Sequence, residues 1–228
     1  LFPARLTAGL PATVTVHLRG RMLFPRLAVI AELQLPALLR AALTPAAWQV
    51  SIRDEKVGPL DFQREADLVG ITAMTATVNR AYEIADRFRQ RGVKVVMGGM
   101  HVSSLPEETL RHCDSVVVGE AEGLWPGVLQ DFEKGQMQPI YRQQNGFPSL
   151  EKLPLANWDL YRNKNFLPVH LVETTRGCPL DCEFCAVTTA FGGRYRNRPH
   201  DQVIAELRSL RPFDGRFTLK NCVFFVDD

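Results

Sequence analysis

Three cysteines give this sequence its most specific chemistry. Cys178, Cys182 and Cys185 are separated by three residues in the first gap and two in the second. One short loop therefore supplies three thiolates, which suit iron–sulfur clusters and zinc. A structural zinc site or an ordinary iron–sulfur ligand set uses four protein ligands. Three thiolates leave one metal position open, and chemistry can take place at an open position.

The spacing Cys-x3-Cys-x2-Cys, with an aromatic residue before the last cysteine, resembles the signature of radical S-adenosylmethionine (radical SAM) enzymes. In that family the loop binds a [4Fe–4S] cluster through three irons, and the fourth iron chelates S-adenosylmethionine (SAM), which is cleaved to a 5'-deoxyadenosyl radical. The resemblance implies that Phe184 flanks the SAM adenine. The residues alone also allow chance clustering, or a zinc knuckle without its fourth ligand, for which His200 is the nearest candidate.

The composition is that of a globular protein with a full core. The chain has 228 residues, 46% hydrophobic and 23% charged, and a formal net charge of +2. So small a net charge does not indicate binding to nucleic acid or to an acidic membrane surface. No apolar run approaches the length of a transmembrane segment. Cys113 and Cys222 lie among apolar residues, so we expect free thiols in a reducing cytoplasm rather than disulfides.

Residues 25–135 alternate between strand and helix patterns. Apolar or alternating runs predict strands at 48–52, 67–72, 93–97 and 115–118. Helical patterns precede and follow these strands, at 27–43, at 81–88 and around 124–132. Gly92 is expected to end the 81–88 helix, and Ser104 is expected to cap a further helix that starts after it. The alternation predicts an α/β fold with a Rossmann-like, doubly wound parallel sheet. Ligands of such sheets bind at the carboxyl ends of the strands, here the loops 53–59, 72–78, 98–104 and 119–122.

A second, shorter pattern follows. Weak periodicity predicts a connector, pinned by Trp158 and Tyr161, before a strand at 169–172 that leads into the cysteine loop. The next helix is expected to begin at an Asp201 cap, to stop before Pro212 and to turn four apolar residues inward, namely Val203, Ile204, Leu207 and Leu210. A strand at 223–226 ends the chain. Strand, cysteine loop, helix and strand are how the partial TIM barrel of radical SAM proteins opens, so the predicted units are residues 1–138, a linker at 139–166, and 167–228.

Three loop motifs precede the cysteines in a fixed order: Ile71–Thr75, Gly98–His101 and Val118–Glu120. Ahead of a radical SAM loop, they resemble the cobalamin-binding domain of B12-dependent radical SAM proteins, a resemblance that covers roughly residues 25–228. It implies a slot for the nucleotide tail of cobalamin, with glycines where a side chain would clash. The contact residues that it implies are Thr72, Thr75, Gly98, Gly99, His101, Gly119 and Glu120.

Some positions depart from the family pattern. Many corrinoid domains have Asp-x-His-x-x-Gly, whose His ligates cobalt, but Lys56 stands at that position, and a protonated Lys has no lone pair. We therefore expect cobalamin without a protein His ligand. Residues 1–22 fit poorly, either because 13–16 replace the usual first strand or because they precede a true start at Met22. The resemblance places Asp227 and Asp228 near the SAM amino group.

The leading hypothesis is a cobalamin-dependent radical SAM enzyme that methylates an unactivated carbon of a small-molecule or lipid-like substrate. Such an enzyme needs an electron donor such as flavodoxin or ferredoxin. Ring formation and other non-methylating reactions are alternatives. Because the chain starts without Met and stops after the second barrel strand, we expect a fragment of a longer polypeptide, and an inactive binding module is a further alternative. The weakest is a zinc-type nucleic-acid contact through Arg194, Arg196 and Arg198.

Overall fold

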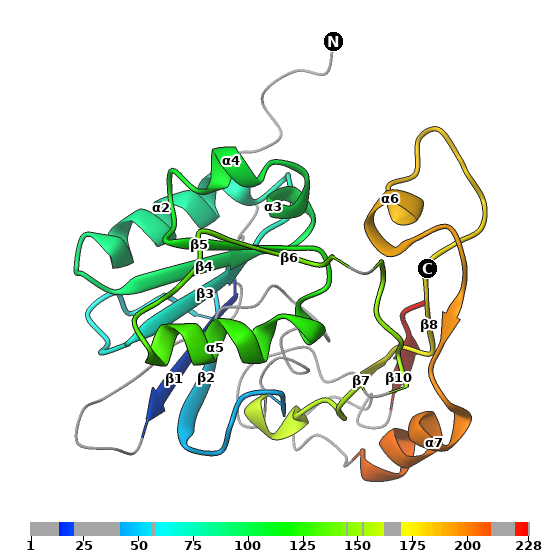
Figure 1. Ribbon diagram of the computed structural model, residues 1–228. Coiled ribbons are helices and arrows are strands. Elements are labelled where there is room, and N and C mark those ends of the chain that lie inside the picture. Colours follow the sequence, from blue (N-terminus) through cyan, green and yellow to red (C-terminus); the bar gives the residue numbers. More distant parts are fainter. Residues whose placement is uncertain are drawn as a thin grey trace.

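The computed structural model (Figure 1) describes residues 42–55, 58–144, 146–151, 153–161, 170–210 and 222–227, and only the backbone at 14–20, 54 and 161. Several predictions fall outside these residues, namely those on most of the 27–43 helix, Lys56, Met22, Pro212 and Asp228. The described part contains one six-stranded sheet with helices, and beside it a smaller unit with two two-stranded sheets.

Four parallel strands lie side by side in the large sheet, and the last of them is an edge strand. They are β3 (Leu68–Thr72), β4 (Lys94–Gly98), β5 (Ser115–Val118) and β6 (Ile140–Arg142). The first three are buried along almost their whole length. Near-continuous apolar runs are typical of strands that are covered on both faces, and the predicted Rossmann-like α/β fold is confirmed.

The remaining part of the sheet differs from the predicted pattern. β1 (Val14–Gly20) lies between β3 and β2 (Trp48–Asp54) and is antiparallel to both. Periodicity indicates which face a strand buries, but it carries no information on strand direction or neighbours. In addition, β6 lies inside the predicted linker. The sequence did not predict it, because a strand of three residues is too short to give a periodic signal.

Helices cover both faces of this sheet (Figure 1). One face carries α2 (Val78–Arg89), α3 (Met100–Ser104) and α4 (Pro106–Thr109). The other carries α5 (Trp125–Glu133), which follows the short helix η1 (Ala121–Gly123). Two covered faces are what a doubly wound sheet requires, since each face buries apolar side chains.

The predicted faces and ends of these helices are largely confirmed. Ala81, Ile84 and Phe88 of α2 are fully buried, and each large apolar side chain buried in this way stabilises the fold by about 1.5–3 kcal/mol. Gly92 follows α2 with φ +79°, the left-handed conformation expected after a helix end. The Ser104 prediction is wrong. Ser104 ends α3 and its hydroxyl donates to the Met100 carbonyl at 3.0 Å, so it does not cap α4.

The smaller unit has the predicted order of strand, cysteine loop, helix and strand. β7 (His170–Val172) pairs in parallel with β10 (Val223–Phe225), and β8 (Thr175–Arg176) pairs antiparallel with β9 (Arg196–Asn197). Its helices are α6 (Val187–Phe191) and α7 (His200–Ser209). The helix η2 (Trp158–Tyr161) precedes them, and the Trp158 ring packs edge-on against His170 with centroids 4.9 Å apart.

The predicted face of α7 is partly confirmed. Val203, Leu207 and Leu210 are half-buried, but Ile204 is 46% exposed. The same inward face also carries Glu206, which is buried beside Arg198. Asp201 lies in the first turn of α7, where a carboxylate is favourable, but the residue at the cap position is Pro199.

Candidate functional site

The carboxyl ends of β3, β4 and β5 meet at one edge of the large sheet, as predicted. Thr72 pairs with Gly98 in the parallel register. The loops that follow are joined by hydrogen bonds, because the Ala73 N–H donates to the Gly98 carbonyl at 3.0 Å and the Gly119 N–H donates to the Ser103 hydroxyl oxygen at 3.0 Å. Most of the predicted cobalamin contacts therefore lie together at this edge.

His101 and Thr75 are brought into contact at this edge. His101 is buried, and its Nδ1 lies 3.2 Å from the Thr75 hydroxyl while its Nε2 lies 3.4 Å from Glu108. The Tyr82 hydroxyl also donates to Glu108, at 3.0 Å. Hydrogen bonds from Tyr82 and His101 lower the pKa of Glu108. Both imidazole nitrogens thus have protein partners, and these partners fix the orientation of the ring.

The fold itself explains the glycine at position 99. Gly99 has φ +104°, and a Cβ there would lie 2.8 Å from the Ala73 carbonyl oxygen and 2.9 Å from a Thr72 methyl group. At Gly98 an added Cβ would find only ordinary contacts, the nearest at 3.7 Å. Gly99 is therefore required by the close approach of the β3–α2 loop. A clash with the nucleotide tail of cobalamin stays a prediction.

Glu120 is at the same edge, but its carboxylate is occupied by two arginines of the smaller unit. Glu120 is 5% exposed. Its Oε2 accepts hydrogen bonds from Arg176 at 2.8 Å and Arg196 at 3.1 Å, and its Oε1 accepts another from Arg196. The predicted direct contact with cobalamin is untested, and in this structure the side chain serves an ion-pair network.

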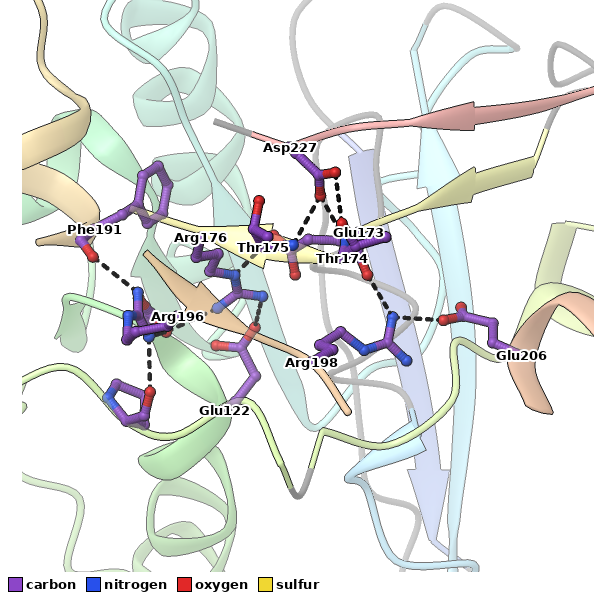
Figure 2. A network of polar contacts seen from close by, with 12 residues as sticks. Glu122, Glu173, Thr174, Thr175, Arg176, Phe191, Arg196, Arg198, Glu206 and Asp227 are labelled. Carbon is purple, nitrogen blue, oxygen red and sulfur yellow. Dashed lines mark hydrogen bonds and ion pairs between the residues drawn. The ribbon is translucent and has the colours of Figure 1, made fainter. Parts of the chain in front are cut away.

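Arg176 extends the network to two further acids (Figure 2). It donates to Glu122 at 2.7 Å and to Glu173 at 2.8 Å. Burial alone would lower the pKa of Arg176, but Glu122 and Glu173 outweigh it and raise the pKa. Burial raises the pKa of Glu173 against the opposing effect of Arg176. The pKa values of the cation and of one of its acids are thus both raised by their buried surroundings.

The other arginines of the predicted basic turn differ among themselves. Arg194 is exposed, while Arg196 and Arg198 are buried. Arg198 donates to Glu206 at 2.6 Å and to the Glu173 carbonyl at 2.8 Å (Figure 2). Two of the three guanidinium groups are therefore engaged by protein partners, and Arg194 is the exposed one of the three.

The cysteine loop is the connection between β8 and β9, and its base is tightly closed. Gly177 has φ +87°, and a Cβ there would lie 2.4 Å from the Arg194 carbonyl oxygen. The Cys178 N–H donates to the Gly192 carbonyl at 3.1 Å, and the Thr188 hydroxyl donates to the Leu180 carbonyl at 2.9 Å. The backbone of the loop is thus held at both ends and once across its middle.

The donor set of this loop fits an iron–sulfur cluster. Cys178 and Cys185 are partly exposed, Cys182 is exposed, and all three are free thiols. Among the described residues, no group of three or more His, Cys, Asp or Glu side chains is arranged to hold one metal ion. A cluster spreads its thiolates over three irons, so its ligands do not need to converge on a single point. Phe184, beside the last cysteine, is 93% exposed.

Asp227 fastens the end of β10 to the segment before the loop. Its carboxylate accepts hydrogen bonds from the Thr174 N–H and hydroxyl, both at 2.6 Å, and from the Thr175 N–H at 2.8 Å (Figure 2). Burial alone would raise the pKa of Asp227, but these hydrogen bonds outweigh it and the pKa is lowered. Its predicted place beside the SAM amino group stays a prediction, and Asp228 lies outside the described residues.

The comparisons with known proteins agree with this arrangement. The B12 binding domain family matches residues 37–129. A bacteriochlorophyllide d C-8(2)-methyltransferase of Chlorobaculum tepidum is 34% identical over 165 residues, which are 68% of this chain and 36% of that protein. The C-12(1)-methyltransferase of the same organism is 32% identical over 204 residues, or 86% of this chain and 44% of that protein. The chain belongs to the B12-binding-domain-containing radical SAM proteins.

The comparison with solved structures found a partial similarity. A structure of the radical S-adenosylmethionine methyltransferase TsrM from Kitasatospora setae, with cobalamin and a [4Fe–4S] cluster bound, is 19% identical to this chain. That match covers 73% of this chain and 39% of that one, with a TM-score of 0.49. The chain spans less than half the length of the two methyltransferases that it matches in sequence. In its described part, no helix is long and apolar enough to cross a membrane.

Sequence reasoning did not assign several residues that hold the cysteine loop in place. Arg176 and Gly177 directly precede Cys178, and this adjacency is a signal that could have singled them out. Glu122 and Arg196 carry no such signal, because their partners lie 54 and 76 residues away along the chain.

Proposed function

We propose that this chain is the cobalamin-binding and cluster-binding part of a B12-dependent radical SAM methyltransferase. Its substrate would be a small molecule or lipid-like compound that is methylated at an unactivated carbon. One observation carries the proposal: a loop with three free thiols is fastened, through Arg176 and Glu120, to the carboxyl edge of the sheet in a B12-binding domain.

The chain's own residues would divide the work as follows. Cys178, Cys182 and Cys185 would bind a [4Fe–4S] cluster, and exposed Phe184 is available to stack on the adenine of SAM. When bound, the cluster and SAM would supply the chemistry that makes a carbon radical on the substrate, and cobalamin would supply the methyl group. Holding two cofactors and a substrate in one geometry contributes strongly to rate, because it removes the entropy cost of an encounter.

Anaerobic reconstitution with iron and sulfide tests the cluster. We expect a brown protein whose reduced form has an iron–sulfur EPR signal that shifts when SAM is added. Cys182→Ala should lose the signal, whereas Cys222→Ala, which removes a free thiol outside the loop, should keep it. One zinc per chain and no iron–sulfur signal would contradict the proposal.

Cobalamin binding is tested separately, by absorbance titration with hydroxocobalamin. Lys56 stands where a cobalt-ligating His would be, so we expect no protein nitrogen on cobalt in the EPR spectrum of the cob(II)alamin form. Methyl transfer also needs an electron donor such as flavodoxin or ferredoxin, and the free cysteines support a reducing, cytoplasmic location. If corrinoid and SAM bind but SAM is not cleaved after reduction, the chain acts as a binding module.

A further inference from the structure

The two arginines that hold Glu120 lie at the base of the cysteine loop. Arg176 and Arg196 are directly opposite each other in the β8–β9 ladder, and the loop with all three cysteines is the connection between them. Glu120 follows β5 in the B12-binding domain. One carboxylate therefore binds both sides of the stem from which the cysteine loop projects.

The pairing is buried and has little room for alternatives. The side chains of Glu120, Arg176 and Arg196 are 2%, 5% and 7% exposed. Removing Glu120 would leave Arg196 out of water without its carboxylate partner, which is strongly unfavourable, while Arg176 would keep Glu122 and Glu173. Arg196 is further held by the Pro148 carbonyl at 2.7 Å and the Phe191 carbonyl at 2.9 Å. The stem thus has one favourable orientation relative to the end of β5.

The loop itself transmits this orientation to the cysteines. A Cβ added at Gly177 would lie within 2.9 Å of the Arg194, Gly192 and Phe191 carbonyl oxygens, so the two sides of the neck of the loop pass close to each other. The Cys178 N–H is bonded to the Gly192 carbonyl inside this neck. A rotation of the stem against β5 would therefore carry the first cysteine with it.

We propose that Glu120 is a positioning residue that fixes the cysteine loop, through Arg176 and Arg196, relative to the carboxyl edge of the B12-binding sheet. This inference rests on the proposed function, because it concerns the geometry between the two cofactor sites. Glu120 then acts on the relative placement of cluster and corrinoid without touching either, which differs from the direct cobalamin contact that the family resemblance implies.

The first test needs no cofactor. Hydrogen exchange of residues 176–196 is compared between the unmodified chain and Glu120→Gln, which keeps the shape of the side chain and removes its charge. We expect exchange in this segment to become about tenfold faster or more, with little change in α2. Glu55→Gln is the matched control, because it removes an acid that pairs with Arg80 within the B12-binding domain. Unchanged exchange in the Glu120 variant would overturn the proposal.

The second test uses the reconstituted chain. With cobalt and cluster both paramagnetic, their mutual broadening in the EPR spectrum depends on distance and orientation. Glu120→Gln should keep the iron content and corrinoid affinity of the unmodified chain while this interaction weakens or becomes heterogeneous. A loss of corrinoid affinity with unchanged loop exchange would instead make Glu120 a ligand contact. Should Glu120→Gln not fold, Arg196→Lys, which keeps the charge but not the forked geometry, takes its place.

The two tests separate this inference from the proposed function. A chain that takes up neither cluster nor corrinoid would contradict the proposed function, and the exchange experiment would still decide whether Glu120 fixes the loop. A chain that binds both cofactors, with equal spin interaction in the Glu120 variant, would retain the proposed function and reject the positioning role.

Discussion

Arg198 and Glu206 form an ion pair of 2.6 Å in which both side chains are 1% exposed. The pair joins the residue after β9 to the inner face of α7, seven residues after the cap position Pro199. A charge inside a protein is costly unless it is paired, so this contact holds inward the same face of α7 that carries the half-buried Val203, Leu207 and Leu210.

The first prediction concerns this pair. Glu206→Gln should lower the free energy of unfolding by about 3–5 kcal/mol, because it leaves the Arg198 cation buried without a counter-charge. The double variant Arg198→Met with Glu206→Leu should recover much of this loss, since two apolar side chains carry no desolvation penalty. Urea denaturation of the unmodified chain, Arg198→Met, Glu206→Leu and the double variant measures the coupling in a double-mutant cycle.

An exposed ion pair provides the control for this cycle. Arg80 and Glu83 lie 2.5 Å apart, but Glu83 is 62% exposed, so Glu83→Gln should change the free energy of unfolding by about 1 kcal/mol or less. Equal losses for Glu206→Gln and Glu83→Gln would contradict the argument from burial.

The second prediction concerns Gly177. Gly177→Ala should destabilise the cysteine loop, because the added methyl group would meet three backbone carbonyls and the residue would keep a positive φ. We expect faster alkylation of Cys178 and Cys182 and a poorer yield of reconstituted cluster. Gly127→Ala is the control: it lies in α5 with open space around it, and should stabilise the chain by about 0.5–1 kcal/mol. If Gly177→Ala leaves thiol reactivity unchanged, the neck of the loop is not tight.

Much of the fold could be predicted because its signals are local. The apolar runs at β3, β4 and β5 specify buried strands within a few residues of their observed ends. The cysteine spacing likewise places three thiols on one loop after a strand. Such features depend on neighbours in sequence, which periodicity and spacing can report.

The rest depends on contacts between distant residues. Arg196 is hydrogen-bonded to Glu120, which lies 76 residues away along the chain, and no local pattern near either residue predicts this contact. The apolar residues of α7 predicted its inward face except at Ile204, but they gave no indication that Glu206 would be buried there by pairing with Arg198. The antiparallel direction of β1 is likewise fixed by pairing with β2 and β3, and is not encoded within its seven residues.

The third prediction is a pH dependence at Asp227. Its pKa is lowered in the folded chain, so the unfolded chain binds more protons as the pH falls below about 4, the ordinary value for Asp. The stabilising contribution is complete above that value and is lost as the pH falls through the folded pKa. The difference in free energy of unfolding between the unmodified chain and Asp227→Asn should therefore be constant from about pH 5 to 7 and shrink at lower pH. A difference that grows on acidification would refute this.

The fourth prediction has the opposite sign and concerns Glu173. Burial raises its pKa, although Arg176 opposes this, so the folded chain holds a proton that the unfolded chain releases above about pH 4.3. Its contribution to stability is therefore present below that value and is lost as the pH rises through the folded pKa. Glu173→Gln keeps a neutral side chain at every pH, so its free energy of unfolding should rise relative to the unmodified chain between about pH 4 and 7. Urea denaturation across this range measures the change. Parallel curves for the two proteins would show that the pKa of Glu173 is the same in the folded and unfolded chains.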